Sequence, residues 1–257
     1  MNSARQSDAK ARRVWRRLSC LLVLTGLVMA GCATGPNANP ADPLEPLNRS
    51  VYKFNDAADR NLLAPVATTY RDVTPSLVKR GIGNFFGNLE DAWSIVNNVL
   101  QLKGEAAAES LMRVSVNTVM GLGGLLDIAT EMQIERHTED FGQTLGHWGV
   151  GPGPYIVLPL LGPSNLRDTS ALPADVWGDA VSHVEDAAVR NTLYGVRIVE
   201  RRAAFLDAGA VVDDAALDKY SFIRDVYLQR RRNAVYDGNP PEDEQVDVAP
   251  TTDSPAK

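Results

Sequence analysis

Cysteine is nearly absent from this chain of 257 residues, which contains only Cys20 and Cys32. Such a chain cannot rely on a framework of several disulfide bonds for its stability. An excess of basic charge is missing as well, because the formal net charge is -6. A nucleic-acid-binding protein needs a basic surface to meet the phosphate backbone. The composition therefore argues against a nucleic-acid partner.

The motifs of the common catalytic classes are also missing. The sequence has no Gly-x-Ser-x-Gly nucleophile elbow, which argues against a lipid hydrolase, and Ser164 fits a turn better than a nucleophile. It has no Gly-x-x-x-x-Gly-Lys-Ser/Thr phosphate loop. The glycines at 81, 83 and 87 fall in or just after an expected helix, whereas a dinucleotide-binding loop follows a strand. We therefore expect no catalytic residues, no cofactor and no enzymatic activity.

The three histidines give little sign of a metal site, because no two of them are spaced as a His-x-x-x-His pair. His137 lies in a charged stretch with residue types suited to acid–base chemistry, but a solvated turn is the simpler interpretation. His147 precedes Trp148, a combination that suits packing or an interface. We expect no metal ligands in this chain.

The first 31 residues are organised as a lipoprotein signal peptide. Basic residues come first, the uncharged apolar run Leu18–Ala30 follows, and small residues precede Cys32. That run is shorter than the roughly 20 residues of a transmembrane helix. The site resembles a lipobox, so we expect cleavage before Cys32, acylation of its thiol, and sorting to the outer membrane because Ala33 follows. Removing six basic residues and one acidic residue leaves 20 and 31, a net charge of -11.

Four segments follow from composition. Residues 1–31 form the signal peptide, 32–42 the lipidated N-terminus and a flexible tether, 43–236 a helical body, and 237–257 a disordered acidic tail. In the body, apolar spacing predicts helices. The first predicted helix starts after an N-cap at Thr74. Further helices are predicted over Asp91–Leu102, Glu105–Met120 and Val184–Leu206, the last of these ending near Gly209. A final helix is capped by Asp213 and reaches Arg232. The fold class is all-α, with Tyr155–Leu158 as the one candidate strand.

A glycine-rich apolar stretch interrupts the helical pattern between residues 121 and 162. The seven apolar residues Tyr155–Leu161 must be buried either in protein or in lipid. Gly149, Gly151 and Gly153 would allow this segment to hinge or to pack closely. We therefore predict that replacing Gly151 by valine impairs function without preventing export. The apolar faces of the expected helices have two interpretations, a membrane interface or an ordinary soluble core, and the residues alone favour the core.

Several short motifs occur in a characteristic order. They are Asp42-Pro43-Leu44-Glu45, Leu47-Asn48-Arg49, Tyr52-x-Phe54-Asn55, Asn84-Phe85-x-Gly87-Asn88-Leu89, Asn117-Thr118-x-x-Gly121-x-Gly123-Gly124, Phe141-Gly142-x-Thr144-Leu145-Gly146-His147, Gly149-Val150-Gly151-x-Gly153-Pro154-Tyr155, Leu158-Pro159, Leu166-Arg167-Asp168 and Tyr227-x-Gln229-Arg230. Each motif is weak alone, but the ordered set resembles the MlaA (VacJ) family of outer-membrane lipoproteins from about Asp42 to Tyr236.

The resemblance implies a ring of amphipathic helices in the inner leaflet of the outer membrane, facing the periplasm and anchored by lipid at Cys32. It also implies a central channel. Family members remove phospholipids that have strayed into the outer leaflet and pass them to the soluble periplasmic carrier MlaC, while a trimeric outer-membrane porin holds the ring. A structural lipoprotein that scaffolds envelope partners is the alternative.

The resemblance also assigns roles to residues near the start of the body. Asn48, Arg49, Phe54 and Asn55 match the family's N-terminal signature, on a helix that the family places near the channel. We expect them to control the state of the ring. The alternative is that these residues start a helix and pack in an ordinary way.

Overall fold

The computed structural model describes residues 39–241, without the side chains of residues 210, 211 and 213–215. Helices dominate, as the sequence predicts. They are α2 (Glu45–Ala58), the π-helix η1 (Asp59–Leu63), α3 (Ala64–Val73), α4 (Ser76–Leu100), α5 (Gly104–Val119), α6 (Ile128–Glu131), α7 (Phe141–His147), α8 (Leu166–Gly178), the 3-10 turn η2 (Ala180–His183), α9 (Ala187–Ala204), α10 (Leu206–Ala215) and α11 (Lys219–Val235). Among these residues, no helix combines the length and apolar character needed to cross a bilayer.

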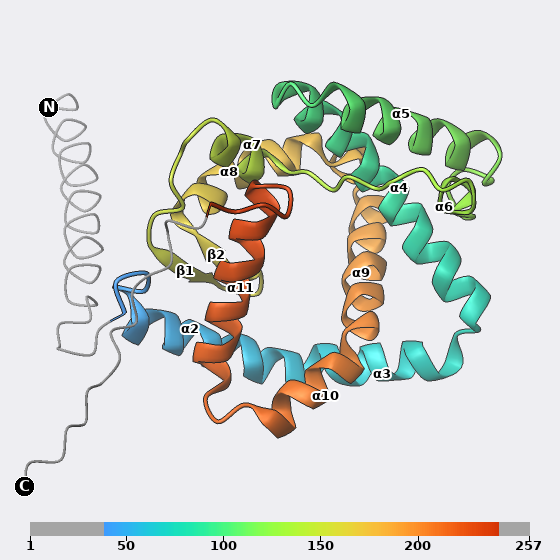
Figure 1. Ribbon diagram of the computed structural model, residues 1–257. Helices are drawn as coiled ribbons and strands as arrows, with labels where there is room; N and C mark the ends of the chain where they lie inside the picture. The colour runs from blue at the N-terminus through green and yellow to red at the C-terminus, as the bar shows by residue number, and fades with distance from the viewer. Residues whose placement is uncertain (1–38, 242–257) are drawn as a thin grey trace, which may run out of the picture.

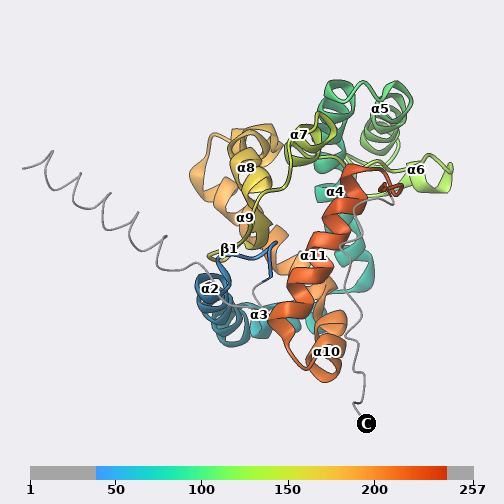
Figure 2. The ribbon, with the colours of Figure 1, turned by 60° about the vertical axis from the view of Figure 1, so that its left-hand side comes forward.

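The long helices lie around the middle of the molecule (Figure 1). There α9 and α11 run on either side, and the continuous run of α2, η1 and α3 crosses the lower parts of both (Figure 1). Helix α3 packs on α9, α4 packs along α5, and α7 packs on α8 (Figure 2). The all-α class is confirmed, whereas a lipid-conducting ring with a central channel stays a prediction.

The π-helix between α2 and α3 has a local cause. Pro65 stands in the first turn of α3, where it has no amide to donate and its ring crowds the preceding turn. A single wider turn relieves that crowding without ending the helix. Residues 45–73 therefore form one long, slightly irregular rod.

Tyr155–Leu158 does form a strand, β1, and it pairs antiparallel with β2 (Gly162–Asn165), which the sequence did not reveal. Tyr155 and Val157 point inward and form a small core with Tyr220 of α11. Leu160 and Leu161 at the tip are 73% and 72% exposed. The apolar run is thus buried in protein only over its first half.

Several expected boundaries are wrong. Helix α4 begins after Pro75 and not at an N-cap on Thr74, and it runs unbroken to Leu100. It does not reach Leu102, because Leu102 takes a left-handed conformation. Gly209 lies inside α10 and does not end α9. Asp213 also lies inside α10, and Asp218 caps α11 through the amides of Tyr220 and Ser221. An Asp just before a helix is a good cap, but the sequence offers more than one such Asp.

Candidate functional site

Asn48 of α2 is the centre of the first cluster, because its side-chain amide holds the backbone of β1. Its Nδ2 donates to the carbonyl oxygen of Tyr155 at 3.0 Å, and the amide of Val157 donates to its Oδ1 at 2.9 Å. The second Nδ2 proton goes to Asp42 Oδ1 at 2.8 Å. Asn48 is only 1% exposed, so each of these partners would otherwise be buried without a hydrogen bond.

Asn55, two helical turns later, bonds the backbone of the hairpin in the same way. Its Nδ2 donates to the carbonyl of Leu158 at 2.9 Å, and the amide of Leu160 donates to its Oδ1 at 2.8 Å. Residues seven apart share one face of a helix, and a primary amide offers the donor and the acceptor that a neighbouring strand would offer. We call Asn48 and Asn55 the asparagine clamp. It fixes the hairpin against α2.

Asp42 joins the clamp to α11. The hydroxyl of Tyr220 donates to Asp42 Oδ2 at 2.5 Å, and Arg224 Nη1 lies 3.4 Å from the same oxygen. Burial, together with the hydrogen bond to Asp42 and its negative charge, raises the pKa of Tyr220. Asp42 is fully buried, so the packed structure includes the last residue of the tether that the composition predicts over residues 32–42.

Arg49 makes the second link between α2 and α11. Its Nη2 lies 2.6 Å from Asp218, its Nε donates to Glu45 at 2.7 Å, and its guanidinium sits 4.3 Å from the centre of the Tyr220 ring. The hydrogen bond from Arg49 holds the pKa of Asp218 well below its usual value. Arg49 therefore acts on the cap of α11. Phe54 takes no part in this cluster and is 55% exposed.

The three glycines before β1 differ from one another. Gly149 and Gly153 have φ values of +87° and +65°, which favour glycine, and a Cβ at Gly153 would meet Leu166 at 3.0 Å. A Cβ at Gly151 would meet nothing within 4 Å. The conformation thus requires glycine at two of the three positions, and the hinge stays a prediction.

Helices α4 and α5 bury polar residues and expose apolar ones. The buried side chains of α4 are Phe86, Asn88, Asp91, Ser94, Asn97 and Asn98, and those of α5 are Ala107, Ser110, Arg113 and Asn117. The large apolar side chains that these two helices leave exposed are Leu77, Val78, Val96, Val99, Leu100, Leu111, Met112 and Val119. In an ordinary soluble helix pair the pattern is the reverse. The interpretation of these faces as a soluble core is therefore wrong.

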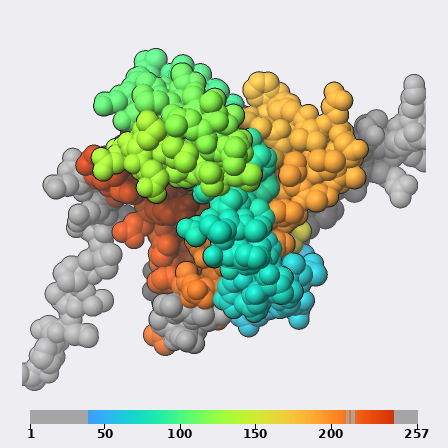
Figure 3. Space-filling view, turned by 90° about the vertical axis from the view of Figure 1, so that its right-hand side faces the viewer, coloured from blue at the N-terminus to red at the C-terminus, as the bar shows by residue number. Residues whose placement is uncertain are grey.

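The outer face of α4 is continuous with the loop after α5 (Figure 3). A Cβ at Gly81 would lie 3.6 Å from the carbonyl oxygen of Leu125, and Asn84 donates to that oxygen at 3.1 Å. Leu122, Leu125 and Leu126 of this loop are exposed. The loop thus extends the apolar surface of α4 and α5.

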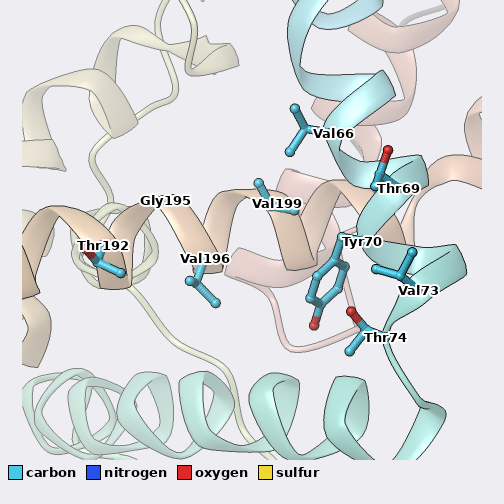
Figure 4. A pocket seen from close by; sticks show the side chains of 9 residues that line it. All are labelled: Val66, Thr69, Tyr70, Val73, Thr74, Thr192, Gly195, Val196 and Val199. Atoms are coloured by element: carbon cyan, nitrogen blue, oxygen red, sulfur yellow. The ribbon is translucent and has the colours of Figure 1, made fainter.

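A cavity of about 590 Å³ lies between α3 and α9. Its lining is mostly aliphatic, from Val66, Val73, Val196 and Val199, and Figure 4 shows these side chains around the ring of Tyr70. The Tyr70 hydroxyl is buried and has no hydrogen-bond partner among the described residues. Burial raises the pKa of Tyr70, and Glu200 adds to this effect. The cavity suits an apolar chain that carries a polar group near one end.

Comparison with known proteins supports the family that the motifs resemble. The MlaA lipoprotein family model matches residues 40–234. The chain belongs to this family. The intermembrane phospholipid transport system lipoprotein MlaA of Escherichia coli (strain K12) is 36% identical over 222 residues, covering 83% of this chain and 86% of that protein. The protein of the same name from Haemophilus influenzae is 30% identical over 233 residues, covering 84% and 89%.

A solved structure of the family is similar over about three quarters of this chain. It is reported as "Structural basis for maintenance of bacterial outer membrane lipid asymmetry", with a TM-score of 0.67 and 35% identity, and the match covers 76% of this chain and 98% of that one. Of the residues singled out from the sequence, the structure brings Asn48, Arg49 and Asn55 together against the hairpin and α11. Cys32 and the expected signal peptide lie outside the described residues.

Sequence reasoning missed the partners of these residues. Asp42 stands in the first family motif, but nothing in its neighbourhood reveals that Tyr220 and Arg224 meet it. A second buried centre, Asp168, was missed in the same way. Arg231 Nε donates to its Oδ2 at 2.5 Å and Tyr227 donates at 2.8 Å. Burial opposes ionisation of Asp168, but the hydrogen bond and charge of Arg231 outweigh it and lower the pKa.

Proposed function

We propose that this chain is the lipoprotein component of an intermembrane phospholipid transport system and removes stray phospholipids from the outer leaflet of the outer membrane. The observation that supports this most directly is the reversed polarity of α4 and α5. Moving an apolar face out of water lowers the free energy by about 25 cal/mol per Å². The acyl chains of a membrane leaflet provide such an apolar environment. The names of the relatives point to the same process.

In this proposal the protein lies within the inner leaflet, held by acylated Cys32 and by a trimeric porin. Phospholipid passes through a channel at the centre of the helical ring to the periplasmic carrier MlaC. No bond is made or broken, so the path needs only an apolar wall and a polar opening. The cavity between α3 and α9 is the described space best suited to an acyl chain.

The first test measures phospholipid in the outer leaflet of cells lacking the gene, by its accessibility to an outer-leaflet acylating enzyme. We expect a rise that the wild-type gene reverses and the Cys32→Ala variant does not. If deletion causes no rise, the protein does not clear lipid, and a scaffold for envelope partners becomes the better interpretation.

A second test asks whether the cavity between α3 and α9 belongs to the lipid path. Val196→Phe places extra volume in the cavity, and we expect several-fold more outer-leaflet phospholipid at normal export. Val189→Phe is the matched control, because Val189 is an exposed residue of the same helix. Equal clearance by both variants would remove this cavity from the proposed path.

A further inference from the structure

Three side chains of metal-ligand type meet between α5 and the extended segment that leads to α7. Glu109 projects from α5, while Glu135 and His137 stand two residues apart on the segment 133–140. Alternate residues of an extended chain point to the same side, so both face α5. One ligand atom from each of the three lies within 4.8 Å of the others, and His137 Nε2 is 2.5 Å from Glu109 Oε2.

A polar pocket of about 500 Å³ surrounds these residues, and Asn98 of α4 forms part of its wall. Asn98 is fully buried, and its Nδ2 bonds the Ser94 carbonyl oxygen at 2.9 Å and approaches the Ser110 hydroxyl at 3.5 Å. Its Oδ1 accepts no hydrogen bond from any described residue. An unpaired buried acceptor costs about 1–3 kcal/mol. Asn98 thus stands in the wall of the pocket with an acceptor to which no described residue donates.

The positive charge nearest to this group is already engaged. Lys103 lies in the same pocket, with its Nζ 3.1 Å from Glu139 and 2.6 Å from Asp237. Those two carboxylates neutralise it, which leaves Glu109 and Glu135 facing each other across His137. A simple His137–Glu109 ion pair would explain one short contact, but it does not explain the place of Glu135 beside them.

We propose that Glu109, Glu135 and His137 bind a divalent transition-metal ion, with Zn²⁺ as the probe. One imidazole and two carboxylates are donors that Zn²⁺ accepts, whereas Mg²⁺ and Ca²⁺ prefer oxygen alone. Water completes the coordination of the ion. The ion ties α5 to the segment 133–140. The expectation of no metal ligands rests on the absence of paired histidines, whereas this proposal uses one histidine that alternates with a glutamate.

The test uses the full mature lipoprotein in detergent micelles, stripped with a chelator and titrated with Zn²⁺ by calorimetry. We expect one Zn²⁺ per chain and a rise in Tm on binding. His137→Ala and the nearly isosteric Glu135→Gln each lower the affinity by at least ~10-fold. His147→Ala is the control, because His147 packs edge-on against Trp148, and it should bind Zn²⁺ as the wild type does.

Two results would overturn the proposal. One is equal Zn²⁺ affinity in the wild type and in both cluster variants. The other is Mg²⁺ binding as tight as Zn²⁺ binding, which would identify a loose group of surface carboxylates. Circular dichroism of each variant confirms that it folds, and Glu135→Gln decides the question if His137→Ala does not. Lipid clearance plays no part in this readout, so the metal site and the proposed function fail independently.

Discussion

Two regions of the molecule bury different kinds of side chain. Around the hairpin, the aromatic and aliphatic side chains of Tyr155, Val157 and Tyr220 form a small core beside the polar groups of Asn48 and Asp42. Between α4 and α5, the buried side chains are mostly amides, hydroxyls and charges, and the aliphatic residues face outward. The first region keeps an apolar core, as a water-soluble protein does, and the second has the reverse pattern. The proposed function accounts for this difference, because acyl chains would surround only the second region.

The largest effect is expected in the polar interior. Arg113 is 3% exposed. It donates to the Ile134 carbonyl at 2.6 Å and to Asp127 at 3.0 Å. Arg113→Met should lower the free energy of unfolding by about 3–5 kcal/mol, because it breaks the ion pair with buried Asp91 and leaves the Ile134 carbonyl without its donor. The measurement is denaturant unfolding in micelles, followed by tryptophan fluorescence.

Arg60→Met is the control for that variant, since Arg60 forms an exposed pair with Asp56 four residues earlier. It should cost less than about 1 kcal/mol. Similar losses in both variants would mean that the interior of α4 and α5 is wetter than its burial indicates.

The asparagine clamp should give the next largest effect. Asn48→Ala leaves the Val157 amide and the Tyr155 carbonyl buried without partners, at a cost of about 2–3 kcal/mol. Asn55→Ala removes the same two types of bond where water has access, so about 0.5–1 kcal/mol is expected. The two variants are compared by denaturant unfolding under the same condition. An equal loss of unfolding free energy would contradict the idea that burial makes the Asn48 bonds the more important ones.

Neighbouring residues of α5 test the reversed polarity itself. Ser110 is 1% exposed and Leu111 is 56% exposed. Ser110→Leu should destabilise the protein by about 1–3 kcal/mol through overpacking, although it makes the helix more apolar. Leu111→Ser should change stability by less than about 0.5 kcal/mol but weaken partitioning into phospholipid vesicles. If Leu111→Ser destabilised the protein more than Ser110→Leu, or if Ser110→Leu weakened vesicle partitioning more, the reversed polarity of α5 would be contradicted.

The smallest effect concerns the glycines. Gly149→Ala forces a side chain into a left-handed conformation at about 1 kcal/mol, whereas Gly151→Ala should leave stability unchanged. If Gly151→Val nonetheless impairs lipid clearance, as the hinge hypothesis predicts, the segment adopts a second conformation in which Gly151 is needed. Normal clearance by Gly151→Val would end the hinge hypothesis.

Local chemistry explains why some of this could be predicted. The spacing of apolar residues revealed α4, α5 and α9, and the short apolar segment Tyr155–Leu158 revealed β1, because these signals lie within a few residues of each other. The reversal of α4 could not be read in this way. A stripe such as Leu77, Val78 and Ile82 shows which residues share a face, but not whether that face meets protein or lipid.

The site shows the same limit. Family motifs identified Asn48, Arg49 and Asn55 as a group, but each of them also has a partner more than 100 residues away. Ion pairs such as Asp42–Arg224 and Asp168–Arg231 also join distant positions. One sequence contains no record of which Asp meets which Arg. Those pairings come only from the tertiary structure.

The clamp has a consequence for how the chain reaches its folded state. Asn48 bonds residues more than 100 positions later, and Asp42 bonds Tyr220 at a separation of 178 residues. Closing such long loops is entropically costly and slows folding. In a polypeptide that crosses a membrane N-terminus first, α2 has no hairpin to bind until residue 160 has emerged. Asp42 likewise has no contact with Tyr220 until α11 has emerged. A helper that shields the amphipathic helices during that interval should speed maturation, and a chain truncated before Lys219 should never close the structure at all.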